Sequence, residues 1–253
     1  MPIPTPFCTP LRTAFLRATV VMLTASASLA PVTAAAQGGA APGTPAPRLM
    51  RAGDVDTVPL RDAGVRIAYG RDSLQFGELR LPAGASNSNR APIAIIIHGG
   101  CWYSPYASIR NSAPLADALA LSGVATWNVE YRRYNNPGGG WTGTFRDVAD
   151  GADYVRTLAT LYPIDTARIV LAGFSQGGAI VFQAGLRYPA RLAGIMALST
   201  YLPLAETLAD EKSADNQDIP IFMAHGSADP VIPVDLAYRS QKKLEQQGYT
   251  LEW

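Results

Sequence analysis

The sequence predicts an α/β fold: a mostly parallel, doubly wound sheet with helices on both faces. Patterns typical of buried strands alternate with helical patterns from residue 54 onward. One strand pattern, Ile93–Ile97, is a continuous apolar run, which is typical of a strand covered on both faces. The composition, 48% hydrophobic and 16% charged over 253 residues, suits a globular protein with one sizeable core.

The first 36 residues differ from the rest and predict a secretory signal peptide. Arg12 and Arg17 precede a short apolar stretch, Ala18–Ala30, and small residues follow up to Gln37. That stretch is shorter than the roughly 20 apolar residues that span a bilayer. We therefore expect cleavage after Ala36, a secreted or periplasmic protein, and no stable association with a membrane. Residues 37–53, rich in Gly, Ala and Pro, predict a flexible linker.

Charge and cysteine content argue against nucleic-acid binding and against an intramolecular disulfide. Residues 1–36 contain two of the 21 basic residues and none of the 20 acidic ones, so the mature chain has a formal charge of −1. Nothing in this balance attracts nucleic acid. Cys8 leaves with the signal peptide, and Cys101 alone cannot form an intramolecular disulfide.

The predicted domain covers residues 54–253. Its first extended segments are Val65–Tyr69 and Leu74–Leu81, and the second alternates apolar and polar residues, as an antiparallel strand with one exposed face does. Strands are further predicted at Val124–Val129, Arg168–Ala172, Leu192–Leu198 and Pro220–Ala224, and helices at Leu115–Leu121, from Thr144, at Gly178–Tyr188 and at Val234–Gln247. An extended segment begins at Thr250 and is expected to pair beside Pro220–Ala224. The sequence ends inside this segment, at Trp253, so we expect the last strand and helix of this sheet to be missing.

The helix from Thr144 carries three acids on one side. Thr144 and Asp147 have the spacing of an N-cap and the third helical residue. Asp147, Asp150 and Asp153 are interpreted as a solvated face near the positive end of the helix, because no other residue with ligand character accompanies them. No metal or cofactor is predicted.

Gly173-Phe174-Ser175-Gln176-Gly177 lies between a predicted strand and a predicted helix. A nucleophilic serine must stand clear of the backbone in a strained strand-to-helix turn, so the positions two before and two after it must lack bulk. The N–H of the next residue, Gln176, then points at a developing oxyanion. The motif therefore predicts Ser175 as a nucleophile.

His98-Gly99-Gly100-Cys101-Trp102 follows the buried strand Ile93–Ile97. Glycines there let the chain fold back and direct N–H groups, those of Gly100 and Cys101, toward Ser175 as the second half of an oxyanion hole. Cys101 has no histidine base, and we expect it to be a small buried residue and not a nucleophile.

Asp229 follows the strand Pro220–Ala224, which gives the chain order of a serine followed by an acid that orients a histidine. An aspartate that only shapes the turn before Pro230 is the alternative. The histidine itself is absent from its expected place. The two histidines of the mature chain, His98 and His225, both precede Asp229 and are expected to brace loops.

Two resemblances cover different parts of the chain. IIIHGGCWYSPY and ATWNVEYRRYNNPGGGWTGTFRDVADGADYVR, between residues 92 and 165, resemble α/β-hydrolases related to arylformamidases and feruloyl-esterase-like enzymes. GFSQGGA, ALSTYLPL, PIFMAHGSADPVIPV and SQKKLEQQGYTLEW, from residue 168 onward, resemble the acyl-protein thioesterase and carboxylesterase family. The first family usually has a small residue where Gln176 stands, and the second usually lacks the HGGCW loop.

These resemblances imply an α/β-hydrolase fold with Ser175 as nucleophile, Asp229 as the orienting acid and the Gln176 N–H as an oxyanion donor. In the second family a loop after the last strand delivers the histidine. The expected activity is hydrolysis of small carboxylic esters or thioesters through an acyl-enzyme. An arylformamidase-like amidase and a catalytically silent acyl-binding protein are the alternatives. Trp102, Tyr103 and Trp141 are candidates for lining an aromatic acyl pocket, although a core role suits each equally well.

Overall fold

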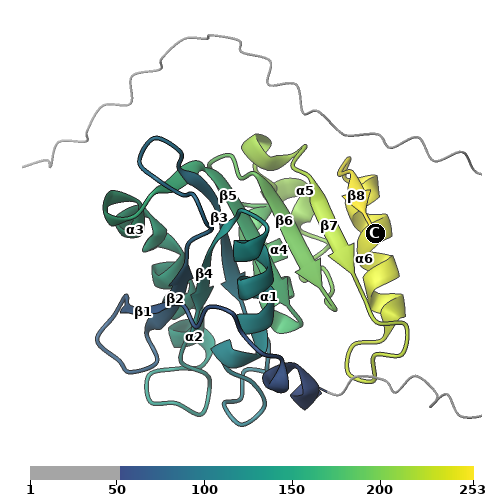
Figure 1. The fold of residues 1–253 in the computed structure, drawn as a ribbon. Helices are drawn as coiled ribbons and strands as arrows, with labels where there is room; N and C mark the ends of the chain where they lie inside the picture. The colour runs from purple at the N-terminus through teal and green to yellow at the C-terminus, as the bar shows by residue number, and fades with distance from the viewer. Residues whose placement is uncertain (1–51) are drawn as a thin grey trace, which may run out of the picture. The chain divides into compact units, whose positions relative to one another are not determined.

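A sheet of eight strands crosses residues 52–253, the part of the chain that the computed structural model describes (Figure 1). The strands lie in the order β1-β2-β4-β3-β5-β6-β7-β8. Their bounds are Val65–Ala68 (β1), Phe76–Arg80 (β2), Ala91–Ile97 (β3), Ala125–Val129 (β4), Ile164–Phe174 (β5), Gly194–Leu198 (β6), Ile221–Ala224 (β7) and Leu251–Glu252 (β8). The predicted signal peptide and nearly all of the predicted linker lie outside the described residues, so both stay predictions.

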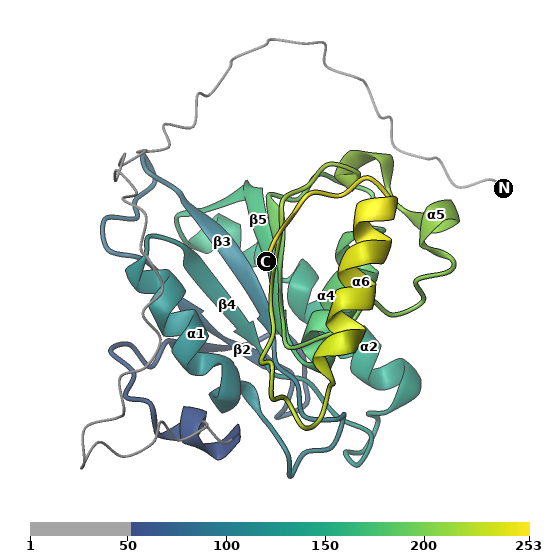
Figure 2. The same ribbon diagram turned by 90° about the vertical axis from the view of Figure 1, so that its right-hand side faces the viewer.

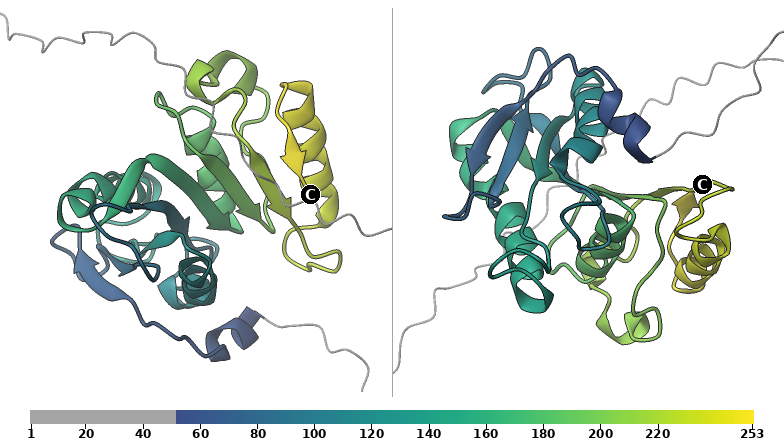
Figure 3. Two further views of the ribbon diagram at one scale, coloured as in Figure 1. Left: turned by 45° about the horizontal axis from the view of Figure 1, so that its top comes forward. Right: turned by 90° about the horizontal axis from the view of Figure 1, so that it is seen from below.

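Pairing in the sheet is parallel from β4 to β8 and antiparallel between β1, β2 and β4. The prediction of a mostly parallel sheet is confirmed. The extended segment from Thr250 does pair in parallel beside β7, with Leu251 opposite Ile221, and Figure 3 shows β8 at the sheet edge opposite β1. The predicted exposed face of β2 is wrong, because four of its five residues are buried.

Helices cover both faces of the sheet, as predicted (Figure 2). α1 packs on one face, where Ala116 belongs to a buried apolar cluster with Ala94 and Ile96 of β3. The other face carries α2, α3, α4 and α6, which share a larger apolar core with the strands. Their bounds are Ala52–Thr57 (η1, a 3₁₀-helix), Ile109–Leu121 (α1), Trp141–Asp153 (α2), Val155–Leu161 (α3), Gln176–Gly185 (α4), Leu208–Glu211 (α5), Ala214–Asn216 (η2, a 3₁₀-helix) and Val234–Gln246 (α6).

α2 differs from its prediction at its start and on its acidic side. It begins at Trp141 after Gly140, and the Thr144 hydroxyl donates instead to the Arg132 carbonyl oxygen, at 2.6 Å. Asp147 is fully buried and accepts hydrogen bonds from the Nε, Nη2 and backbone N–H of Arg132. The solvated-face interpretation is therefore wrong for Asp147, although Asp150 and Asp153 are exposed.

On the α1 face the sheet continues beyond the helix. Val170 and Met196 line an apolar groove of about 530 Å³ that extends over Phe222 and Leu251. None of the helices described between residues 52 and 253 is long and apolar enough to cross a membrane. The candidate site lies elsewhere, at the carboxyl ends of the parallel strands, where β3, β5 and β7 deliver their polar loops.

Candidate active site at the carboxyl ends of the strands

Ser175 stands in a sharp turn between β5, which ends at Phe174, and α4, which begins at Gln176. Its backbone has φ 56° and ψ −123°, a conformation that residues other than glycine rarely adopt. Two contacts hold this strained turn: the Ser175 N–H donates to Leu198 O at 2.9 Å, and the Thr200 hydroxyl donates to Ser175 O at 2.7 Å. The turn fixes Ser175 at the positive end of α4.

Gly173 and Gly177 make this turn sterically feasible. A Cβ on Gly173 would meet the carbonyl group of Gly177 at 2.4 Å, and a Cβ on Gly177 would meet Ile97 O at 2.0 Å. Both distances are far below any ordinary contact, so α4 approaches β3 and β5 this closely only because neither residue has a side chain. The lack of bulk that the motif requires is thus explained by the described packing.

The loop after β3 lies against Ser175 with its N–H groups turned inward. Gly100, Cys101 and Trp102 have φ values of 114°, 51° and 59°. Consecutive residues of this kind can present their N–H groups to one shared acceptor. The N–H groups of Gly100 and Cys101 both donate to Oε1 of Gln176, at 3.0 and 2.8 Å, and the Ser175 hydroxyl reaches the same oxygen at 3.2 Å. The three residues predicted to form the oxyanion hole therefore lie together beside Ser175.

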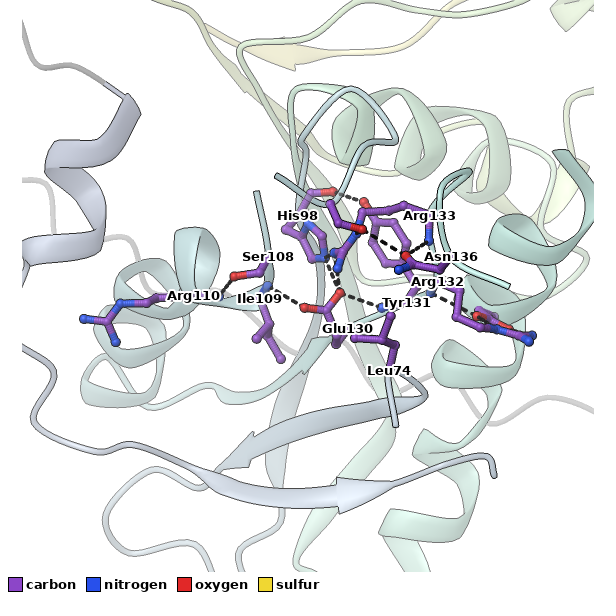
Figure 4. Close-up of polar contacts among 12 residues, drawn as sticks. Leu74, His98, Ser108, Ile109, Arg110, Glu130, Tyr131, Arg132, Arg133 and Asn136 are labelled. Atoms are coloured by element: carbon purple, nitrogen blue, oxygen red, sulfur yellow. Dashed lines mark hydrogen bonds and ion pairs between the residues drawn. The ribbon is translucent and has the colours of Figure 1, made fainter. Parts of the chain in front are cut away.

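A buried ionic network supports this loop from below (Figure 4). Glu130, directly after β4, accepts from His98 Nε2 at 3.0 Å and Arg133 Nη1 at 2.6 Å, and its second oxygen accepts from the Ile109 N–H at 3.0 Å. Tyr131 stacks on the His98 ring and donates its hydroxyl proton to His98 O at 2.6 Å. The network joins the ends of β3 and β4 to the start of α1.

Ionisation of Glu130 is favoured despite its burial. Burial raises the pKa of this carboxyl, but the hydrogen bond and charge of His98, the charge of Arg133 and the Ile109 N–H outweigh it and lower the pKa to about 2. Burial also raises the pKa of Tyr131 above its usual range, so its hydroxyl keeps its proton. The loop therefore rests on a carboxylate and a phenol that stay in fixed protonation states at neutral pH.

Neither histidine hydrogen-bonds to Ser175 within the described residues. His98 is buried, and its Nδ1 and Nε2 face oxygen acceptors on Gly99 and Glu130, at 2.7 and 3.0 Å. The expectation that it braces a loop is confirmed. His225 lies 3.1 Å from Gly226 O through Nδ1, while its buried Nε2 has no hydrogen-bond partner among the described residues. The Ser175 hydroxyl bonds only to Gln176 in this part of the chain.

Asp229 lies in the loop after β7, two strands away from β5. Its Oδ1 accepts from the N–H groups of Val231 and Ile232, at 2.8 and 3.0 Å. That geometry shapes the turn, as the alternative interpretation expected. Oδ2 accepts no hydrogen bond from the described residues and can still orient a base. The turn contact and the role as orienting acid are therefore compatible.

The aromatic candidates do not form one pocket. Trp102 is half-buried and packs against Phe145, whose ring also meets Trp141 edge-on. Trp141 itself is 83% exposed. Tyr103 lies apart, between the rings of Tyr106 and Tyr134.

Cys101 is exposed, so its prediction as a buried residue is wrong. The reason is the left-handed backbone of the loop, which presents its N–H group to the site and leaves its side chain at the surface. Among the described residues, no group of three or more His, Cys, Asp or Glu side chains gathers as metal ligands would.

Sequence reasoning missed Glu130, Tyr131 and Arg133. Their signal was present: a polar run, Glu-Tyr-Arg-Arg, directly follows a buried strand at the sheet edge where the predicted site lies. Thr200, which follows β6 at the same edge and bonds Ser175 O, was also missed.

Esterases are among the solved structures that have a similar fold. A truncated carbohydrate esterase from gut microbiota superposes with a TM-score of 0.60 at 18% identity, over 76% of this chain and 86% of that one. A thermophilic esterase from Thermogutta terrifontis gives a TM-score of 0.59 at 17% identity, over 75% of this chain and 79% of that one. The chain has the α/β-hydrolase fold. At these identities the likeness establishes the fold alone.

Two protein families match this chain over overlapping segments. The phospholipase/carboxylesterase family matches residues 152–251, and the BD-FAE family matches residues 78–196. The predicted resemblance to two kinds of hydrolase is confirmed, and both matches include the Ser175 turn.

Curated relatives that match part of this chain are acyl-protein thioesterases. Acyl-protein thioesterase 1 of Neurospora crassa is 45% identical over 92 residues, 36% of this chain and 38% of the relative. The same enzyme of Schizosaccharomyces pombe is 43% identical over 81 residues, 32% of this chain and 36% of the relative. The chain thus matches little more than a third of the length of these relatives.

Proposed function

We propose that this protein hydrolyses carboxylic esters or thioesters, with Ser175 as the nucleophile. The observation that carries the proposal is the position of one oxygen: Gln176 Oε1 accepts from two loop N–H groups and from the Ser175 hydroxyl. A carbonyl oxygen held by two N–H groups beside a serine hydroxyl is the arrangement that acyl transfer requires. The thioesterase and carboxylesterase resemblances of residues 152–251 agree with it.

In the proposed reaction Ser175 attacks the carbonyl carbon of a small ester or thioester. The N–H groups of Gly100, Cys101 and Gln176 stabilise the oxyanion, and the alcohol or thiol leaves with a proton. Water then cleaves the acyl-enzyme. Asp229 orients the base that this cycle needs, and Trp102, the half-buried aromatic residue that follows the two N–H donors in the loop, is proposed to contact the acyl group. Neither His98 nor His225 bonds to Ser175, so the described residues do not supply that base.

Two other functions each have one observation in their favour. The absence of a hydrogen bond between either histidine and Ser175 among the described residues favours a silent acyl-binding protein. The match of residues 78–196 to the BD-FAE family, with the resemblance of the HGGCW segment to arylformamidases, favours an amidase. Formanilide hydrolysis faster than hydrolysis of the matching phenyl ester would select the amidase.

Exogenous imidazole separates the esterase from the silent binder. We expect hydrolysis of p-nitrophenyl butyrate and of a butyryl thioester to be slow without imidazole and to rise at least tenfold with it, because a small base typically contributes 10²–10⁴-fold when positioned. Ser175→Ala must abolish the imidazole-dependent part, and Ser227→Ala, an exposed serine, must not. Rapid hydrolysis without imidazole would reveal a base within the protein. No Ser175-dependent hydrolysis under either condition would overturn the proposed function.

A further inference from the structure

The oxyanion hole of this protein is filled by one of its own side chains. Gln176 Oε1 lies 3.0 Å from Gly100 N and 2.8 Å from Cys101 N. These distances fall in the range of donors around an oxyanion, 2.7–3.1 Å. The donors that should meet a substrate carbonyl oxygen already hold a carboxamide oxygen.

The orientation of the carboxamide is determined by its surroundings. Two N–H donors converge on one atom, which must therefore be the acceptor oxygen of the amide and not its nitrogen. The other end, Nε2, lies 3.3 Å from Cys101 Sγ, a weak acceptor. The Ser175 hydroxyl completes the set at 3.2 Å from Oε1. The carboxamide oxygen of Gln176 thus takes the place of a substrate carbonyl oxygen, because it accepts from both loop N–H groups and from the hydroxyl of the nucleophile.

A substrate carbonyl cannot enter while this contact persists, because two oxygens cannot occupy the same pair of donors. Gln176 is the first residue of α4 and is half-buried, so its side chain can rotate away without disturbing the helix. Its backbone N–H stays in place when the side chain leaves. The occupied and open forms therefore differ in one side-chain rotation.

We propose that the Gln176 side chain competes with the substrate carbonyl oxygen for the N–H groups of Gly100 and Cys101, and so sets the affinity of the site. This inference rests on the proposed function. Only the fraction of molecules in the open form binds, so the apparent dissociation constant rises by the inverse of that fraction. The penalty is the same for every substrate whose carbonyl enters the hole. It raises KM and leaves the rate at saturation unchanged.

Phenylboronic acid tests this competition without needing turnover. Its boron forms a bond with Ser175 Oγ, the serine proton goes to solvent, and one boronate oxygen enters the hole. We expect Gln176→Ala and Gln176→Met to bind it about tenfold more tightly than the wild type, as follows if the open form is about a tenth of the population. Met keeps the bulk of the side chain and removes the acceptor. Gln176→Glu, whose carboxylate holds the same donors more strongly, should bind more weakly than the wild type.

Hydrogen exchange measures directly whether Gln176 accepts hydrogen bonds from the N–H groups of Gly100 and Cys101. Amide exchange at Gly100 and Cys101, followed by NMR, should be faster in Gln176→Met than in the wild type, because both N–H groups lose their acceptor. Gln241→Met, which removes a half-buried glutamine whose side-chain amide donates to Glu245 among the described residues, is the matched control and should behave as the wild type.

The outcomes separate the two proposals. Ser175-dependent boronate binding that is no tighter in the Ala and Met variants would overturn the competition and leave the proposed function standing. Unchanged exchange at Gly100 and Cys101 would overturn it as well. Boronate binding that is absent from every variant, or that survives Ser175→Ala, would overturn the proposed function and the competition with it.

Discussion

Glu130 connects the chemistry of the site to the stability of the fold. It is almost fully buried, and its ion pair with Arg133 and hydrogen bond with His98 fix the loop that carries Gly100 and Cys101. Removing one partner of a buried ion pair leaves the other charge without compensation, which is costlier than never having buried the pair. Glu130 is therefore a positioning residue that acts through the loop above it.

Glu130→Gln should lower the free energy of unfolding by on the order of 3 kcal/mol at pH 7, because Arg133 loses its buried anionic partner. Urea unfolding measures it. Glu206→Gln is the control, since Glu206 is 90% exposed in its pair with Lys243 and such pairs contribute about 0–1 kcal/mol. A Glu130→Gln variant as stable as the wild type would contradict the structural role of this network.

The lowered pKa of Glu130 predicts that the folded protein becomes less stable in acid. The pKa of Glu130 is lowered from 4.5 to about 2 in the folded protein, so ionisation stabilises the fold above pH 4.5. That contribution declines as the pH falls from about 5 toward 2. Between pH 5 and 3 the free energy of unfolding should therefore fall more steeply in the wild type than in Glu130→Gln. Parallel pH profiles would contradict the lowered pKa.

At the scale of elements, the junction of α4 with β3 depends on the missing side chain of Gly177. A Cβ there would lie 2.0 Å from Ile97 O, so Gly177→Ala must push α4 and the Ser175 turn away from β3. Overpacking of this kind typically costs about 1–3 kcal/mol, and we expect a loss of stability in that range. Gly226→Ala, whose Cβ would meet nothing closer than 3.9 Å, should change it by less than about 0.5 kcal/mol. Thermal unfolding compares the two, and equal effects would contradict the close approach.

Elements defined by local patterns were predictable, and those defined by distant contacts were not. The Ser175 turn and the HGGCW loop are local motifs, because glycine spacing records how closely the backbone must approach. α1 begins at Ile109, six residues before its prediction, because Ser108 caps it while Pro114, which usually ends a helix, lies inside. Glu130 and Asp147 are charged residues whose burial follows only from the packing of β4 against α1 and α2, which no local pattern contains.

At the scale of the molecule, the two family resemblances meet inside one sheet. Residues 78–196 and 152–251 match different families, yet β5 pairs with β3 on one side and β6 on the other. One apolar core extends from Leu79 in β2 to Tyr249 after α6. No structural boundary within residues 52–253 therefore separates the segments that match the two families.

This continuity predicts that both halves of the sheet unfold together. A domain with one core normally unfolds in a single cooperative transition, since neither half keeps its buried surface without the other. Hydrogen exchange of peptides from β3–β4 and from β6–β7, measured by mass spectrometry across a urea series, should give the same midpoint. Peptides from β1 serve as the control for local fraying, because that edge strand pairs only with β2 and should open earlier. A β6–β7 midpoint clearly below that of β3–β4 would show that the two matched segments behave as separate folding units.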